Sequence, residues 1–235
     1  MKSDLRKYTK RNINKFNFPR LSVTAWLIIV NVLFFAIAFP LMLINQDYSK
    51  YISLQPSYIL QGKYLWTFVT SMFMHGGIAH LLVNMFVLFS LGSFCEKVIG
   101  RKRFFWFYIV SGLIAGVAFV LLSGFFGNTD LGAKIFGSPL IAGVGASGAI
   151  FAIAGLFVVL TPKLKFSIIF FPFFSLPAYI MIPLVLFATW LVSAGTGLPI
   201  GNTAHFGGFL VGIIYGFYLK KRYSRKIEML NKYIK

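Results

Sequence analysis

The chain is poor in negative charge and in cysteine. Only five of its 235 residues are acidic, against 23 lysines and arginines. None of the five lies in the middle of a long apolar run, and no internal repeat is evident, which argues against a transporter or channel. Cys95 is the only cysteine, so no internal disulfide can form, and we interpret it as a packing residue.

What the chain has in abundance is apolar surface. Apolar residues make up 58% of it and aromatic residues 18%, with 28 phenylalanines. The mean hydropathy of +0.79 excludes an ordinary soluble domain. The first 20 residues are polar and basic, and no small-residue cleavage site follows the first apolar run. We therefore expect that run to remain as a helix rather than to be removed as a signal peptide.

The apolar runs predict an all-α polytopic membrane protein with one compact domain. Two of the runs are short for a span of about 20 residues and should cross steeply or thin the bilayer locally. The segment 166–176 is interpreted as an interfacial or partly buried approach to the fifth span. The predicted spans are 24–44, 75–95, 104–125, 147 to about 161–162, 177–194 and 204–219, within a membrane domain 23–220 between basic tails 1–22 and 221–235.

The net charge of +18 comes from blocks of lysine and arginine that flank the apolar runs. A nucleic-acid surface would instead interleave basic and aromatic residues, so we expect no nucleic-acid partner. Both tails and the loops after the second and fourth spans carry most of the charge, whereas the opposite side has only Lys50, Lys63 and Lys134. The positive-inside rule then predicts that both termini are cytoplasmic and that anionic lipids contact the basic side.

This orientation has a consequence for the polar residues. The second, fourth and sixth spans all begin on the outer side, and each begins with polar groups. Polar side chains inside a membrane are costly and therefore suggest function. The candidates His80, Asn84, Ser147 and His205 should all lie in the outer part of the bilayer, on three different helices.

Ser147 lies in the motif Gly145-Ala146-Ser147-Gly148 at the start of the fourth span. A serine hydroxyl becomes a useful nucleophile when a base takes its proton, and helix-start N–H groups suit a developing oxyanion. Taken alone, the motif also fits a serine N-cap in a tightly packed helix.

His205 opens the sixth span and is followed by glycines at four-residue intervals, which is typical of helices that touch backbone to backbone in membranes. The fourth span offers a similar face of small residues, so the two helices could bring Ser147 and His205 within hydrogen-bond reach. Alone, His205 also fits an interfacial histidine beside a packing motif. The small residues are Gly208, Gly212 and Gly216 on the sixth span, and Gly148, Ala152 and Gly155 on the fourth.

His80 and Asn84 are four residues apart on the second span and so share a helix face, whereas His75 should end the preceding loop. A proton relay, a metal site and a pair of hydrogen-bond donors are all open interpretations. A metal is disfavoured because no acidic residue or cysteine lies nearby to complete its coordination, and donors aimed at an oxyanion fit better. We expect no cofactor.

No acidic residue is placed to orient His205, which favours a Ser–His dyad over a triad. Phe151 lies one helical turn after Ser147 and could hold the imidazole by stacking instead.

With these motifs in view, residues 55–219 resemble the rhomboid family of intramembrane serine proteases. The resemblance rests on His75-x4-His80-x3-Asn84, on the serine motif, on Ala204-His205-x-Gly207-Gly208, and on Leu91-Gly92…Glu96-Lys97…Gly100. It implies a six-transmembrane-helix rhomboid-like bundle of the prokaryotic core type, with a long, partly membrane-embedded first loop within 46–73.

The resemblance also implies roles. Ser147 would be the nucleophile, His205 the general base and then general acid, and His80, Asn84 and the Ser147 backbone N–H the oxyanion site. The implied enzyme is a serine endopeptidase, a multi-pass protein of the prokaryotic plasma membrane, that cleaves single-span membrane proteins near the outer face. Many bacterial relatives have Trp-Arg where this chain has Trp66-Thr67, and tyrosine in place of Phe151.

Two other functions are open at this point. One is a catalytically inactive rhomboid-like protein that binds transmembrane helices, which would need the fold but not the dyad. The other is the transporter or channel that the absence of intramembrane carboxylates disfavours. No feature of the sequence predicts an oligomeric state.

Overall fold

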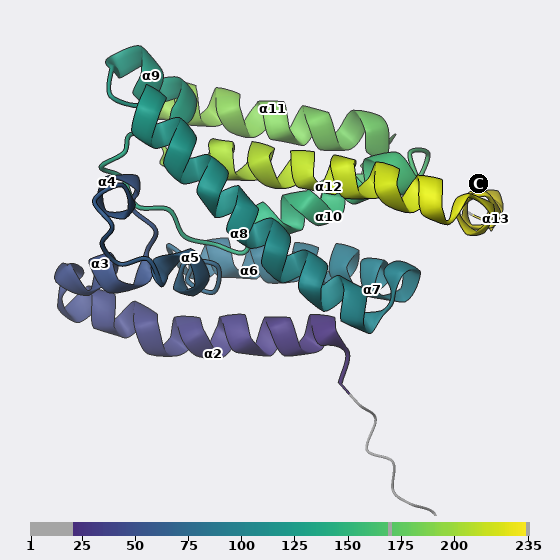
Figure 1. The fold of residues 1–235 in the computed structure, drawn as a ribbon, viewed down its shortest axis with the longest axis horizontal. Coiled ribbons are helices and arrows are strands. Elements are labelled where there is room, and N and C mark those ends of the chain that lie inside the picture. Colours follow the sequence, from purple (N-terminus) through teal and green to yellow (C-terminus); the bar gives the residue numbers. More distant parts are fainter. Residues whose placement is uncertain (1–20, 169–170, 234–235) are drawn as a thin grey trace, which may run out of the picture.

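The computed structural model describes residues 21–168 and 171–233, so most of the predicted N-terminal tail 1–22 lies outside the described residues. Long helices pack side by side into one bundle, and short helices connect them at one end (Figure 1). The elements are α2 (Val23–Ile44), η1 (Gln46–Tyr48), α3 (Ser49–Ile52), α4 (Pro56–Ile59), α5 (Thr67–Thr70), α6 (Ile78–Val87), the π-helical segment η2 (Leu88–Gly92), α7 (Ser93–Ile99), α8 (Arg101–Phe126), α9 (Asp130–Phe136), α10 (Ser147–Leu160), β1 (Lys165–Ile168), β2 (Phe171–Pro177), α11 (Ala178–Thr196), α12 (Asn202–Arg222) and α13 (Ser224–Tyr233).

The bundle is that of an integral, multi-pass membrane protein. Among the described residues, four stretches are long and apolar enough to cross a membrane: α2, the continuous segment Ile78–Ile99, α8 and α11. These stretches leave large apolar side chains such as Trp26, Leu82 and Phe187 exposed, as lipid-facing helices do. Helix α10 is shorter, and α12 ends in three basic residues, so the count of six spans stays a prediction.

Helix α10 forms the centre of the bundle. It is apolar on all sides, and most of its side chains are buried, as expected for a helix surrounded by other helices. Its small residues let neighbouring backbones approach closely. The helix therefore holds its first residue, Ser147, in a fixed position relative to α8 and α12.

The predicted small-residue faces of α10 and α12 meet. A Cβ added to Gly208 would collide with the carbonyl oxygen of Gly148, and one added to Gly212 with that of Ala152. The third predicted pairing, between Gly216 and Gly155, does not form, because Gly216 faces the side chain of Val159. Gly155 instead lies against the backbone of Phe209.

The carboxylate of Glu96 has a structural role that the sequence did not suggest. It accepts hydrogen bonds of 2.9 Å from the backbone N–H groups of Val23 and Thr24 and from the Thr24 hydroxyl. Its side chain also lies 3.7 Å from Arg101. These N–H groups at the start of α2 have no partner within the helix, so Glu96 ties the second span to the first.

The predicted first loop, 46–73, contains the four short helical segments η1 and α3 to α5. Its own hydrogen bonds close it: the Trp66 indole donates to the carbonyl of Tyr51 at 3.0 Å, and the Thr70 hydroxyl to that of Ile52 at 2.8 Å. Leu54 pairs with Gly143 through reciprocal backbone bonds. The loop is thereby fixed to the segment that leads into Ser147.

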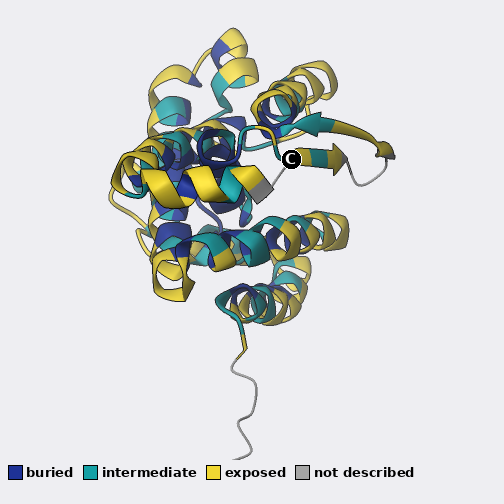
Figure 2. Ribbon diagram, turned by 90° about the vertical axis from the view of Figure 1, so that its right-hand side faces the viewer, coloured by how far each residue is buried: buried dark blue, intermediate teal, exposed yellow. Residues whose placement is uncertain are grey.

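The segment 166–176, predicted as an approach to the fifth span, lies in an antiparallel β-hairpin that projects beside the bundle (Figure 2). Pro172 and Pro177 prevent a continuous helix here, and the phenylalanine- and isoleucine-rich sequence favours strands. The base of the hairpin is closed by a bond from the Ala178 N–H to the carbonyl of Leu164, the residue before β1.

The described part of the predicted C-terminal tail 221–235, residues 221–233, is mostly helical. Helix α12 continues to Arg222, and α13 then runs across the end of the bundle (Figures 1 and 2). Ile227 of α13 is buried, and the Asn231 amide donates a 2.8 Å hydrogen bond to the carbonyl of Leu160. That carbonyl is one of the four at the end of α10 that have no partner within the helix.

Because α10 and α12 touch through backbone atoms, we expect Gly212→Ala to destabilise the protein. The added methyl group meets backbone atoms of Ala152 and Leu156, which cannot move aside as a flexible side chain can. Overpacking of this kind costs about 1–3 kcal/mol. The measurement is the thermal unfolding midpoint in detergent. Gly195→Ala is the control, because nothing lies within 4 Å of a Cβ there. Equal midpoints for the two variants would contradict this packing.

Candidate active site

Two helix starts bring Ser147 and His205 together. Ser147 is the first residue of α10, and His205 lies in the first turn of α12. The Ser147 Oγ and the His205 Nε2 are 2.8 Å apart, a normal hydrogen-bond length. The residue at the N-cap position is Ala146, and the serine hydroxyl makes no capping bond. The alternative interpretation of Ser147 as an N-cap is therefore wrong.

The imidazole of His205 is held by an aromatic ring. Its plane stacks on Phe151 with ring centroids 4.4 Å apart and an interplanar angle of 23°. The residue is buried, and its Nδ1 has no hydrogen-bond partner among the described residues. If Ser147 donates its proton to Nε2, the proton of the neutral ring must be on Nδ1. The stacking predicted for Phe151 is confirmed.

His80 lies beside the serine. A Cβ built on Gly145 would be 3.1 Å from the His80 Cε1, 3.2 Å from its Nε2 and 3.5 Å from the Ser147 Oγ, so these groups surround Gly145. The Gly76 backbone N–H donates to the His80 Nδ1 at 3.3 Å. Because Nδ1 accepts, a neutral His80 carries its proton on Nε2, the nitrogen that faces Gly145.

Asn84 lies one helical turn from His80 on α6. Its side-chain Nδ2 donates to the carbonyl of His80 at 2.9 Å, and the residue is buried. Among the described residues no hydrogen bond joins Asn84 to Ser147 or His205. The structure thus brings three of the four candidate residues into one cluster, with Asn84 on the adjacent turn.

Gly145 is the residue that lets the chain pass so close to His80. Its φ of +129° is a conformation that residues with a side chain rarely adopt. Its N–H donates to the carbonyl of Ser71 at 2.8 Å, which fixes this loop against the end of the first loop. A glycine is required here both by backbone conformation and by the space next to the imidazole.

Two residues support the site without having been singled out for that role by the sequence. His75 is fully buried in the loop before α6, as predicted, and its ring meets the His80 ring edge-on with centroids 5.1 Å apart. Trp190 of α11 donates to the carbonyl of Ile135 at 2.6 Å and meets the ring of Phe206, with centroids 5.9 Å apart. The first contact stabilises His80, and the second connects α11 to the residue after His205.

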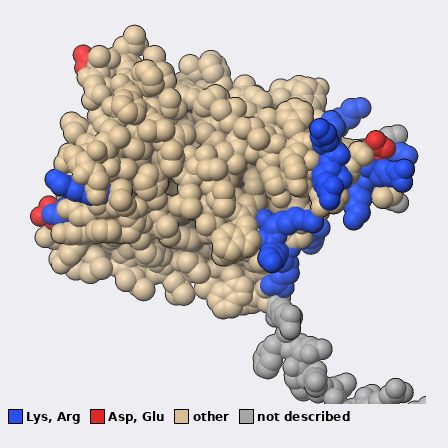
Figure 3. All heavy atoms as spheres, viewed as in Figure 1, with Lys and Arg blue, Asp and Glu red and all other residues tan. Residues whose placement is uncertain are grey.

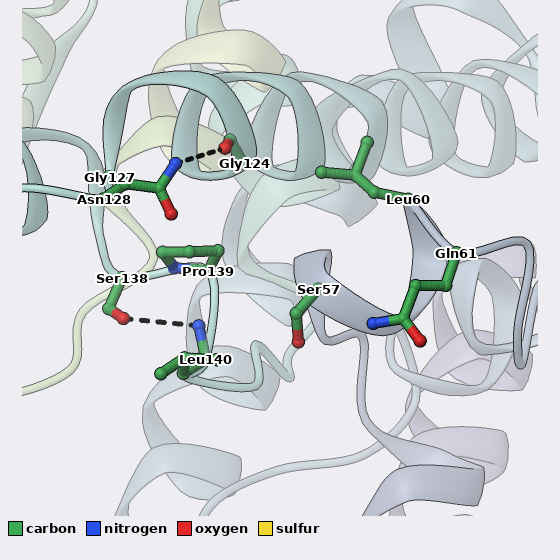
Figure 4. Close-up of a pocket in the computed structure, with 9 residues that line it drawn as sticks. All are labelled: Ser57, Leu60, Gln61, Gly124, Gly127, Asn128, Ser138, Pro139 and Leu140. Carbon is green, nitrogen blue, oxygen red and sulfur yellow. Dashed lines mark hydrogen bonds between the residues drawn. The ribbon is translucent and has the colours of Figure 1, made fainter.

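A cavity of about 440 Å³ lies away from this cluster, where the ends of α4 and α8 meet the loop before α10 (Figure 4). Its lining is uncharged, and none of the four candidate residues contributes to it.

Among the described residues, no three His, Cys, Asp or Glu side chains are grouped as metal ligands would be. The 2.8 Å contact between the Ser147 Oγ and the His205 Nε2 allows proton transfer between these two side chains, next to the His80 imidazole.

Comparison with known proteins identifies the family. The rhomboid domain model matches residues 62–222. Rhomboid protease GlpG of Haemophilus influenzae is 27% identical over 184 residues, which are 78% of this chain and 84% of that protein. Rhomboid protein 1 of Saccharomyces cerevisiae, a mitochondrial protein, is 31% identical over 75% of this chain and 47% of its own length. Rhomboid protease GluP of Bacillus subtilis is 27% identical over 69% of this chain and 26% of its own length.

The chain therefore spans most of the Haemophilus protein but less than half of the yeast and Bacillus proteins. With the domain model covering the helices that carry Ser147 and His205, this chain belongs to the rhomboid family.

Proposed function

We propose that this chain is an intramembrane serine endopeptidase that cleaves transmembrane protein substrates by a Ser147–His205 dyad. The observation that carries the proposal is the 2.8 Å hydrogen bond between the Ser147 Oγ and the His205 Nε2. It joins a nucleophile and a base that are 58 residues apart in the sequence. The similarity to proteins named as rhomboid proteases supports the same function.

The reaction follows from the two atoms in contact. The Ser147 Oγ attacks the scissile carbonyl carbon while the His205 Nε2 takes the hydroxyl proton. When the tetrahedral intermediate collapses, the C–N bond breaks, and Nε2 returns the proton to the leaving amine. A water molecule then attacks the acyl-enzyme while the His205 Nε2 takes a proton from it. When the ester C–O bond breaks, Nε2 returns that proton to the Ser147 Oγ, and the new C-terminus leaves as a carboxylic acid.

The oxyanion of the tetrahedral intermediate would be stabilised by groups around Gly145. The His80 Nε2–H faces this position, since its Nδ1 accepts from Gly76. The backbone N–H of Ser147 at the start of α10 has no acceptor within its helix. Asn84 could donate with the Nδ2 proton that is not used by the carbonyl of His80. Donors aimed at developing charge in a low-dielectric site commonly contribute most to rate acceleration.

The dyad lies toward the end of the bundle that has few cations. Helix α10 runs from Ser147 to Leu160, and Leu160 contacts α13 at the basic end, so the serine is about 20 Å from that end. Figure 3 shows lysine and arginine gathered at the α13 end of the molecule. By the positive-inside rule, both termini are cytoplasmic and cleavage occurs near the outer face, on substrates with a single span.

We expect Ser147→Ala to fold normally and to abolish cleavage of a model single-span substrate. The assay is turnover by the purified protein in proteoliposomes, with fluorophosphonate labelling as a second measurement. Ser90→Ala is the control, because Ser90 is an exposed serine whose hydroxyl bonds only to the carbonyl of Phe86. Substantial turnover by Ser147→Ala would contradict covalent catalysis. An absence of turnover and labelling in the wild type would favour the catalytically inactive, helix-binding alternative.

Asn84→Ala should lower kcat by about 10²–10³-fold, the usual effect of losing one oxyanion donor. KM should change little, because the donor acts on charge that develops only in the transition state. The double variant with His80→Ala should lose less than the product of the two single effects if both donors serve the same oxygen. An unchanged kcat with a raised KM would instead assign Asn84 to substrate positioning.

The orientation can be tested by thiol labelling in a Cys95→Ala background. A cysteine at Met229 on α13, which is exposed, should resist an impermeant thiol reagent in intact cells and react after permeabilisation. A cysteine at Asn128, near the opposite end of the bundle, should react in intact cells. The reverse pattern would overturn both the orientation and the assignment of the cleaved side.

A further inference from the structure

The basic end of the molecule gathers cations from three helices (Figure 3). Helix α8 begins with three consecutive cations and α12 ends with three more, and α13 adds others. The only carboxylate on these three helices in the described chain is Glu228 of α13, and Glu96 on the neighbouring α7 caps α2. The cations are Arg101, Lys102, Arg103, Lys220, Lys221, Arg222, Arg225, Lys226 and Lys232.

Two of these cations converge on one tyrosine. The Arg103 guanidinium donates a 2.9 Å hydrogen bond to the Tyr223 hydroxyl and lies 5.2 Å from the centre of its ring. The Lys226 Nζ lies 5.9 Å from the centre of the same ring. Neither cation forms an ion pair with any residue that the structure describes. Tyr223 lies between α12 and α13, so the cluster Arg103–Tyr223–Lys226 joins the start of α8 to this junction.

The cluster concentrates positive charge near one ring, which makes it attractive to an anion. Like charges near one ring repel each other, and three cations in the first turn of α8 oppose the partial positive charge of the helix start. Arg101 is partly neutralised, since it lies 3.7 Å from Glu96 and donates to the carbonyl of Leu21. Arg103 and Lys226 contact Tyr223, but neither has a carboxylate of the described residues within ion-pair distance.

The cluster lies where lipid headgroups meet the apolar surface of the bundle. Trp106 on α8 and Tyr218 on α12 are more than half exposed, one turn or so inside Arg103 and Tyr223. Exposed tryptophan and tyrosine mark the boundary between acyl chains and headgroups. Helix α13 lies across the ends of the long helices, in the orientation of a helix parallel to the membrane surface (Figures 1 and 2).

The site is also held in a fixed shape. The bond from Asn231 to the carbonyl of Leu160 and the buried side chain of Ile227 fix α13 to the bundle. Lys226 is therefore presented from a docked helix, unlike a lysine in a flexible tail. Rigid cations at headgroup depth can bind a phosphate with less loss of side-chain entropy than mobile ones.

We propose that Arg103, Tyr223 and Lys226 form a binding site for the phosphate of an anionic lipid headgroup. Arg103 can donate to phosphate oxygens, Lys226 adds charge, and the Tyr223 ring positions both cations. The exposed Trp106 and Phe105 next to Arg103 provide an apolar surface for the acyl chains of the same lipid. The site is independent of the dyad and does not rest on the proposed proteolytic function.

The full-length protein in mild detergent is titrated with phosphatidylglycerol, and bound lipid is counted by native mass spectrometry while the unfolding midpoint is followed. The wild type should retain phosphatidylglycerol in preference to phosphatidylcholine and unfold at a higher temperature with it. Arg103→Gln and Lys226→Gln should each weaken phosphatidylglycerol binding about fivefold, the contribution of one cation near an anionic membrane. Arg103→Lys should recover part of the affinity.

The matched control is Lys134→Gln, which removes one cation from the opposite end of the bundle and should leave binding unchanged. Midpoints measured in phosphatidylcholine alone verify that each variant is folded. The proposal is overturned if phosphatidylglycerol binds no better than phosphatidylcholine, or if Lys134→Gln weakens binding as much as Arg103→Gln. It is also overturned if inorganic phosphate without lipid stabilises the wild type equally, since the site would then bind a free anion.

Discussion

The contact between Ser147 and His205 depends on how closely the backbones of α10 and α12 approach. No side chain separates the helices at Gly208 or Gly212, whose Cα atoms lie against the carbonyls of Gly148 and Ala152. Helix association in lipid lacks the hydrophobic driving force found in water, so close van der Waals packing of small residues must supply it. A displacement on the order of 1 Å can change a rate by about 10²-fold. The glycines are therefore as much a condition of the Ser147–His205 contact as the two side chains that make it.

The cluster around the serine uses rings and backbone groups where a soluble protease would use a carboxylate. The chain has three histidines, and all of them lie at or next to this cluster. Phe151 fixes the plane of His205, and the Gly76 N–H fixes the proton of His80 on Nε2. Burying a carboxylate at this depth would cost free energy unless it were paired. Its interaction with the imidazole would then have to offset part of that free energy. Stacking orients the imidazole without adding a charge.

The sequence predicted the elements whose signals are local or periodic. The long helices, the glycine faces of α10 and α12 and the position of His75 in a loop followed from apolar length and four-residue spacing. The hairpin 165–177 did not, because a short apolar segment rich in phenylalanine and proline fits a strand, a loop or an interfacial segment equally well. Glu96 and Asn231 were missed because each bonds to backbone groups more than 70 residues away, and no pattern in one sequence reports such a pairing. The hydrogen bond to Gly76 was missed for the same reason, since it depends on one backbone N–H in a loop.

The cations that would set the orientation in the membrane and the Ser147–His205 contact lie toward different ends of the bundle. The cations that would set the orientation lie around α13 and the start of α8, whereas Ser147, the hydrogen-bond partner of His205, lies about 20 Å away at the other end of α10. A cation next to His205 would repel the positive charge that the imidazole gains when it takes a proton. With the cations at the far end, the proposed base His205 would take a proton without a lysine or arginine of that end beside it.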